Sequence, residues 1–172
     1  LHPALVVSEK HPSFLYYTGG TLWQKEFEIF DKLPNYHYID ADDISGLLPR
    51  MDILVTDFSS VALEFLILDR PLVYIDCPDF YEKIYYQLYG SFSFVNKEDL
   101  LNNPGLNAGR HVGKVAYTLD QLPSIVLHEL DNPDELASHR RELIKKLVYN
   151  PGSASIAACD YLETLIKMGS KI

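Results

Sequence analysis

The sequence predicts an α/β fold: a Rossmann-like parallel sheet of about five strands with helices on both faces. Short, β-prone apolar runs alternate with longer helical patterns along most of the 172 residues, which is typical of β-α-β units with right-handed crossovers. The run at 52–56 has the core Ile53-Leu54-Val55, which suits a strand buried on both faces. A hydrophobic content of 47% beside 23% charged residues is that of a globular chain. We therefore expect one domain over residues 1–172.

Five segments are expected to be strands because each is short and rich in apolar, β-branched or aromatic residues. They are residues 4–7, 36–39, 52–56, 72–75 and 114–118. Helices are predicted from apolar residues at helical spacing or from a start signal such as Asn-Pro-Asp. They are residues 21–33, 44–50, 59–69, 80–90, 119–130, 133–149 and 153–168. Residues 96–112 are rich in Asn and Gly and are expected to form a loop with one helical turn.

Charge and cysteine content exclude several classes of protein. A net charge of −9 argues against a broad nucleic-acid surface, which needs clustered Lys and Arg. Cys77 and Cys159 fit neither a disulfide framework nor a metal-ligand spacing, so we expect two structural thiols in a reducing compartment. No apolar run approaches the ~20 residues of a membrane helix. The chain opens on Leu1-His2-Pro3, without an initiator Met or a signal region, and is expected to be part of something longer.

Two loops at strand ends carry the candidate binding residues. In open α/β sheets, ligands bind beyond the carboxyl ends of the strands, where the strand order reverses. In the expected order 2-1-3-4-5, Lys10 and His11 after the first strand face Ser59 and Ser60 after the third. Hydroxyls and free N–H groups at a helix start suit a phosphate, and Lys10 and His11 would supply positive charge. The alternative is that Ser59 only caps its helix and that His11 is structural.

Other chemistries fit the same segment less well. Asp57 at the end of ILVTD resembles the phosphoacceptor of receiver domains, but those domains need an acidic pair after their first strand. Here Glu9 is followed by Lys10 and His11. The Gly-x-Ser-x-Gly elbow of hydrolases, the Gly-x-Gly-x-x-Gly fingerprint and the Walker loop are all absent from the sequence.

The order of these motifs resembles a known family. Lys-His-Pro at 10–12 is followed by an acidic "DI…LL" turn, by DILVTDFSSVALEFLILDRPLVYID at 52–76, and by a Tyr-containing segment. This order is similar to the carboxy-terminal half of the CDP-glycerol glycerophosphotransferases, the teichoic-acid polymerases and primases of bacterial cell walls. The family's phrase is close to "D-hydrophobic-ITDYSS…(D/E)-F…-P". The residues that fit it are Asp57, Phe58, Ser59, Ser60, Glu64, Phe65 and Pro71. Gly113 with 119–122, and 150–158, are softer matches.

The resemblance implies the donor-binding half of a GT-B fold, in which two Rossmann-like halves close over a nucleotide-activated donor. Lys10, His11, Ser59 and Ser60 would contact the donor pyrophosphate, with Asp57 and Glu64 in support. No metal or cofactor is implied. The departures are Phe58 in place of the commoner Tyr, and a terminal segment at 150–158 that lacks the Asp before Gly and the Arg after it.

The implied activity is transfer of glycerol phosphate from CDP-glycerol to a membrane-attached cell-wall polymer. The catalytic residues, including a general-base histidine, would lie in an acceptor-side half outside this sequence, so we expect the isolated half to be inactive. The implied location is cytoplasmic, with a peripheral position at the inner face of the bacterial membrane.

Two further functions stay open. One is a GT-B glycosyltransferase that uses a nucleotide sugar for surface polysaccharide. The other is a non-catalytic module whose Tyr-rich face at 81–89 binds a partner. The choice between a CDP-glycerol transferase and a nucleotide-sugar glycosyltransferase depends on the nucleobase. Carboxylates expected near the nucleobase favour CDP over UDP, because they accept a hydrogen bond from the cytosine amine. They are Asp40, Asp42, Asp43, Asp76 and Asp79.

Overall fold

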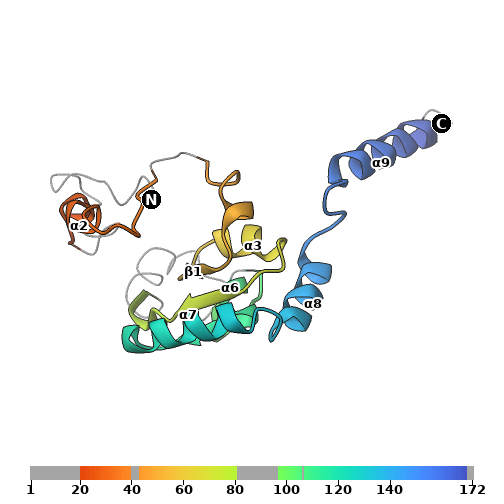
Figure 1. Cartoon of the computed structure of the whole chain (residues 1–172). Coiled ribbons are helices and arrows are strands. Elements are labelled where there is room, and N and C mark those ends of the chain that lie inside the picture. The colour runs from red at the N-terminus through yellow and green to blue at the C-terminus, as the bar shows by residue number, and fades with distance from the viewer. Residues whose placement is uncertain (1–19, 40–42, 81–96, 106, 170–172) are drawn as a thin grey trace. The chain divides into compact units, whose positions relative to one another are not determined.

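The computed structural model describes residues 20–39, 43–80, 97–105 and 107–169 (Figure 1). The chain divides between Arg50 and Met51 into two compact units. In the first unit, helix α2 spans Trp23–Phe30, which confirms the helix predicted over 21–33. Aromatic rings of this helix contact one another and a ring that follows it: the ring of Phe27 stacks on that of Trp23 at 6.2 Å and on that of Tyr38 at 5.1 Å between centroids.

The strand predicted at 36–39 is wrong, because these residues form no strand. Tyr36 and Tyr38 are β-prone, but their rings pack on Phe30 and Phe27 of α2. A β-prone segment becomes a strand only where a second backbone pairs with it. The helix expected at 44–50 is reduced to a 3₁₀ turn, η2, at Leu48–Arg50. Pro49 therefore lies inside this turn and does not end it, since a first turn needs no N–H there.

The second unit contains a three-stranded parallel sheet of β1 (Leu54–Thr56), β2 (Leu72–Ile75) and β3 (Lys114–Ala116), in that order. Leu54 pairs with Leu72, and Val73 pairs with Lys114. These strands confirm the third, fourth and fifth predicted strands and their neighbour order. The strand predicted at 4–7 lies outside the described residues, so the described sheet has three strands and not five.

The two neighbours of β2 make it the centre of this sheet. Leu72, Val73 and Tyr74 are each no more than 1% exposed, and since successive side chains point to opposite faces, both faces of β2 are covered. The sequence predicted burial on both faces for the third strand, at 52–56, and this prediction is wrong. Val55 in the middle of β1 is 37% exposed, because β1 lies at the edge of the described sheet.

Helices α3 (Val61–Leu66) and α6 (Ala108–Val112) lie against each other and against the sheet. A Cβ on Gly109 would lie 3.1 Å from the Tyr74 ring and 3.3 Å from the Leu72 side chain. A Cβ on Gly113 would lie 2.5 Å from the backbone oxygen of Leu72, closer than real contacts allow. Glycine at these positions therefore lets α6 and the start of β3 approach β2 closely.

The helix predicted over 59–69 is shorter in the structure, because α3 ends at Leu66. A turn follows, in which Asp69 adopts a left-handed backbone conformation with φ of 51°. Pro71 begins the approach to β2, and the residue before a proline is biased away from the helical region. Arg70 then donates from Nη1 to the backbone oxygen of Met51 at 2.5 Å, which ties this turn to the segment before β1.

The remaining helices follow the prediction in part. The loop expected at 96–112 is wrong, because it contains α5 (Lys97–Asn102) as well as α6. The predicted helices at 119–130, 133–149 and 153–168 are confirmed. They appear as η4 (Leu119–Gln121) with α7 (Leu122–Asp131), as α8 (Ala137–Leu147), and as α9 (Ala154–Gly169). Figure 1 shows α7 running beside the sheet, where it contacts β2 and β3. Within the described ranges, no helix is both long and apolar enough to cross a membrane.

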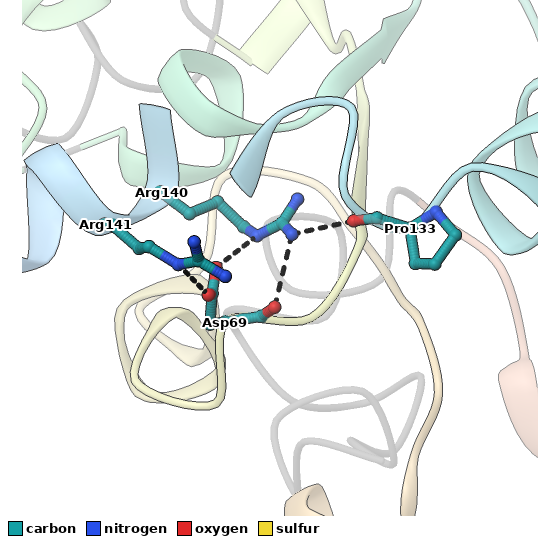
Figure 2. A network of polar contacts seen from close by, with 4 residues as sticks. All are labelled: Asp69, Pro133, Arg140 and Arg141. Carbon is teal, nitrogen blue, oxygen red and sulfur yellow. Dashed lines mark hydrogen bonds and ion pairs between the residues drawn. The ribbon is translucent and has the colours of Figure 1, made fainter. Parts of the chain in front are cut away.

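A buried arginine joins α8 to the turn before β2 (Figure 2). Arg140 is 1% exposed, and its Nε donates to the carboxylate of Asp69 at 3.1 Å. Its Nη2 donates to the backbone oxygens of Asp69 at 3.2 Å and Pro133 at 2.8 Å. The neighbouring Arg141 donates to the second carboxylate oxygen of Asp69 at 2.5 Å. One carboxylate in a left-handed turn therefore receives two guanidinium groups.

Candidate functional site

The carboxyl ends of the three parallel strands bring polar residues to one edge of the sheet. Asp57 directly follows β1, Asp76 and Cys77 follow β2, and Tyr117 follows β3. We call these four residues, together with Ser59 and Ser60, the carboxyl edge. In parallel α/β sheets this edge is where ligands bind.

The turn between β1 and α3 presents both serines to solvent. Ser59 and Ser60 are exposed, and their backbone oxygens accept the first bonds of the helix, from Ala62 N at 3.3 Å and Leu63 N at 2.9 Å. The Ser59 hydroxyl accepts from Val61 N at 3.4 Å, a long hydrogen bond. Ser60 makes no side-chain capping hydrogen bond. The hydroxyls thus contribute little to capping, and a helix of only six residues adds little dipole.

Two other predicted site residues lie on the same turn and helix. Asp57 and Glu64 are both exposed, with Glu64 in the first turn of α3. The intervening Phe58 packs its ring on that of Phe80 at 5.1 Å between centroids. Phe58 therefore fixes the turn to the segment after β2, while the residues on either side of it face solvent.

A cation that the sequence did not reveal stands at the carboxyl edge. Arg110 of α6 donates from Nη1 to Asp76 Oδ1 at 2.6 Å. Its guanidinium also lies 5.8 Å from the ring centre of Tyr74 and 5.9 Å from that of Tyr117. Burial alone would lower the pKa of Arg110, but the hydrogen bond and charge of Asp76 outweigh it, and the pKa is raised. The side chain is thus a fixed positive charge at 23% exposure.

Local sequence offers no signal for Arg110. Its partner Asp76 is 34 residues away, and the surrounding segment was expected to be a loop. Only the folding of α6 against β2 brings the two charges together.

The thiol of Cys77 is affected by the negative charges of the same edge. Its pKa is raised, first by burial and then by the negative charges of Asp57 and Asp76. Its Sγ donates to the backbone oxygen of Ile75 at 3.6 Å. The thiol therefore stays protonated at neutral pH, which agrees with a structural thiol and not with a nucleophile.

The structure brings together only part of the predicted site. Lys10 and His11 lie outside the described residues, as do Asp40, Asp42 and the Tyr-rich segment 81–89. Asp43 accepts a hydrogen bond from Ser45 N at 2.8 Å, and this bond lowers the pKa of Asp43. Asp43 thus stabilises a local turn, and Asp76 is engaged by Arg110.

The comparison with protein families bears on the segment that carries the turn. Residues 21–90 match the family described as CDP-Glycerol:Poly(glycerophosphate) glycerophosphotransferase. Over this stretch, the sequence is similar to the CDP-glycerol glycerophosphotransferase family. The predicted resemblance is thereby confirmed.

The glycerophosphotransferase match runs through α2, β1, the serine turn, α3 and β2. It ends before α5, so Arg110, β3 and the last three α-helices lie outside it. A search of curated proteins found no match, and a search of solved structures found none either.

Proposed function

We propose that this chain is the donor-binding part of a CDP-glycerol glycerophosphotransferase, and that the carboxyl edge holds the donor diphosphate. The observation that carries the proposal is the position of the serine turn. It lies inside the family match, it follows a parallel strand, and its two hydroxyls are exposed and hardly used by the fold.

The chemistry of the edge fits a diphosphate held by several weak partners. Ser59 and Ser60 offer hydroxyl donors, and Arg110 offers a fixed cation across the end of β2. A hydrogen bond from a charged donor to a phosphate is shorter and stronger than a neutral one. Asp57 and Asp76 repel a diphosphate, so the donor needs positive charge beyond Arg110. Lys10 and His11 are the residues proposed to supply it, and Glu64 is proposed to accept from a donor hydroxyl.

The proposed reaction follows from the donor. An acceptor hydroxyl attacks the phosphorus that carries glycerol, the bond between the two phosphates breaks, and CMP leaves with the added negative charge. Cations at the carboxyl edge would stabilise that charge as it develops. The general base that takes the acceptor proton is proposed to lie in an acceptor-side half of a two-domain GT-B protein. Residues 1–172 would be its donor domain, inactive alone.

The acceptor would be a membrane-attached cell-wall polymer of the teichoic-acid type. The protein would work in the cytoplasm, at the inner face of the membrane.

Calorimetry tests the donor site directly. CDP-glycerol and CDP are titrated into the chain and into the Ser59→Ala/Ser60→Ala double variant. We expect the variant to bind more weakly by about 1–3 kcal/mol, the scale of lost hydrogen bonds to a charged group. Ser124→Ala is the matched control, since Ser124 is also exposed near a helix start and its hydroxyl donates to a backbone oxygen. Equal affinity in the double variant and its parent would refute the role of the serines.

Competition between nucleotides tests the donor class. We expect CDP to bind more tightly than UDP by about 1 kcal/mol or more, because an acceptor-rich surface suits the cytosine amine. Since Asp43 and Asp76 are already hydrogen-bonded, backbone oxygens would provide much of this preference. A preference for UDP or a UDP-sugar would favour the nucleotide-sugar glycosyltransferase. Absence of nucleotide binding at millimolar concentration would favour the non-catalytic module.

A further inference from the structure

A second polar cluster lies at the opposite end of β3 from the carboxyl edge. It consists of His128 and Glu129 at the end of α7 and Glu135 in the segment between α7 and α8. One ligand atom from each residue lies within 4.8 Å of those of the other two. His128 Nε2 and Glu135 Oε2 are 2.5 Å apart.

Glu129 is the unusual member of this cluster. It is 0% exposed, and neither of its carboxylate oxygens has a hydrogen-bond partner among the described residues. Burying a carboxylate without a partner is costly, and burial raises the pKa of Glu129. The nearby cations donate hydrogen bonds to other acceptors. Lys114 Nζ donates to Glu135 Oε1, and Arg140 donates to Asp69 and to the backbone oxygen of Pro133. The fold thus supplies two buried acceptor atoms with nothing to accept.

An imidazole nitrogen and two carboxylate oxygens form a donor set that transition-metal ions use in proteins. Zn²⁺ takes such ligands at about 2.0–2.2 Å in tetrahedral geometry, and the imidazole disfavours Mg²⁺ and Ca²⁺, which prefer oxygen. Glu135 can bind the metal without losing its ion pair with Lys114. Its Oε2 would contact the metal in place of His128, while Oε1 keeps the hydrogen bond from Lys114. Such a hydrogen bond to the far oxygen of a ligating carboxylate orients it.

We propose that His128, Glu129 and Glu135 form a binding site for one divalent transition-metal ion, with Zn²⁺ as the best match. The metal would join the end of α7 to the segment before α8 and, through Lys114, to the start of β3. Because Lys114 begins β3 and the carboxyl edge follows its last residue, Ala116, this site is separate from the proposed donor site. Its role would be structural.

Metal titration of the whole chain tests the proposal. The protein is stripped with EDTA, dialysed, and titrated with ZnCl₂ by calorimetry and with Co²⁺ by visible absorption. We expect one saturable site, with Co²⁺ bands of a four- or five-coordinate centre and no thiolate charge-transfer band. A thiolate band would place the metal on Cys77 or Cys159 and overturn the proposal.

Two variants test the proposed ligands, and a third serves as their control. Glu129→Gln keeps the shape of the buried side chain, and His128→Ala changes a half-exposed one, so each is expected to fold. Each should lower Zn²⁺ affinity at least about tenfold, since even an outer-shell change can have that effect. His139→Ala is the matched control, because His139 is an exposed helix histidine outside the cluster, and it should bind as the parent does. No Zn²⁺ binding at micromolar concentration, or equal binding in all variants, would refute the site.

Discussion

The buried arginine in Figure 2 allows a sharp comparison, because two neighbouring arginines contact the same carboxylate from different environments. Arg140 is 1% exposed, whereas the side chain of Arg141 is 62% exposed. The perturbation is Arg140→Met, which keeps most of the stem volume and removes the guanidinium. Arg141→Met is the matched control. Any effect of the change in side-chain type is similar in the two variants, so the difference measures the environment.

The expected magnitude follows from the contacts. Arg140 donates three hydrogen bonds, to the carboxylate and backbone oxygen of Asp69 and to the backbone oxygen of Pro133. Breaking a buried ion pair by removing one partner costs about 3–5 kcal/mol. Two features reduce this cost: Asp69 keeps Arg141, and Nη1 of Arg140 is itself buried with no hydrogen-bond partner among the described residues. We therefore expect Arg140→Met to lower the free energy of unfolding by about 2–4 kcal/mol. Arg141→Met should lower it by no more than about 1 kcal/mol, as for exposed ion pairs.

Urea unfolding followed by circular dichroism measures both variants. The slope of the free energy with urea should stay unchanged, so that the shift in midpoint reports stability. Raising the salt concentration should weaken the effect of Arg141 more than that of Arg140, since exposed charges are screened more strongly. Equal destabilisation by the two variants, or a loss below about 1 kcal/mol for Arg140→Met, would refute the reasoning that burial makes this contact important.

Three further predictions concern glycine, thiol and carboxylate positions. Gly113→Ala should destabilise the chain by about 1–3 kcal/mol in urea unfolding, because its Cβ would meet a backbone oxygen of β2 at 2.5 Å. Gly46→Ala is the control, since a Cβ on Gly46 would lie in open space. Equal losses of unfolding free energy in the two variants would contradict the packing around Gly113. A thiol reagent at neutral pH should label the exposed Cys159 before Cys77, whose pKa is raised by burial and two neighbouring carboxylates; CDP should slow only Cys77, and equal rates would contradict its burial. In EDTA, Glu129→Gln should be more stable than the parent at pH 7. The pKa of Glu129 is higher in the folded state than in the unfolded state, so the parent loses stability as the pH rises through the folded-state pKa. That advantage should vanish below the ordinary glutamate pKa of about 4.3, and a variant no more stable than the parent at pH 7 would contradict the prediction.

The sequence predicted the elements whose signals are local. Residues 72–75 are apolar and lie between Pro71 and Asp76, and β2 has these bounds. The helices after residue 118 follow from their start signals and periodicity. The prediction failed where the outcome depends on a distant partner. The strand at 36–39 found none, and Val55 is exposed because of its place in the sheet.

In the candidate site, too, the sequence predicted the local features and missed the contacts between distant residues. The serine turn was predicted because a strand, a polar break and a helix follow one another along the chain. The pairing of Arg110 with Asp76 was not predicted, since it depends on how α6 packs on β2. The burial of Glu129 was also missed, because the polar HELDNPDE sequence around it is typical of a solvated helix end. Its 0% exposure arises only from packing in three dimensions.

The edge position of β1 has a consequence for any strand that the sheet could add. In the described sheet, β1 pairs on one side only, with β2. A strand added to its other side would be aligned by the hydrogen bonds of that single ladder. A slip of one residue would shift the added strand by about 3.3 Å and turn each of its side chains to the other face. The residues that such a strand brought to the carboxyl edge would thus depend on the alignment of one pair of strands.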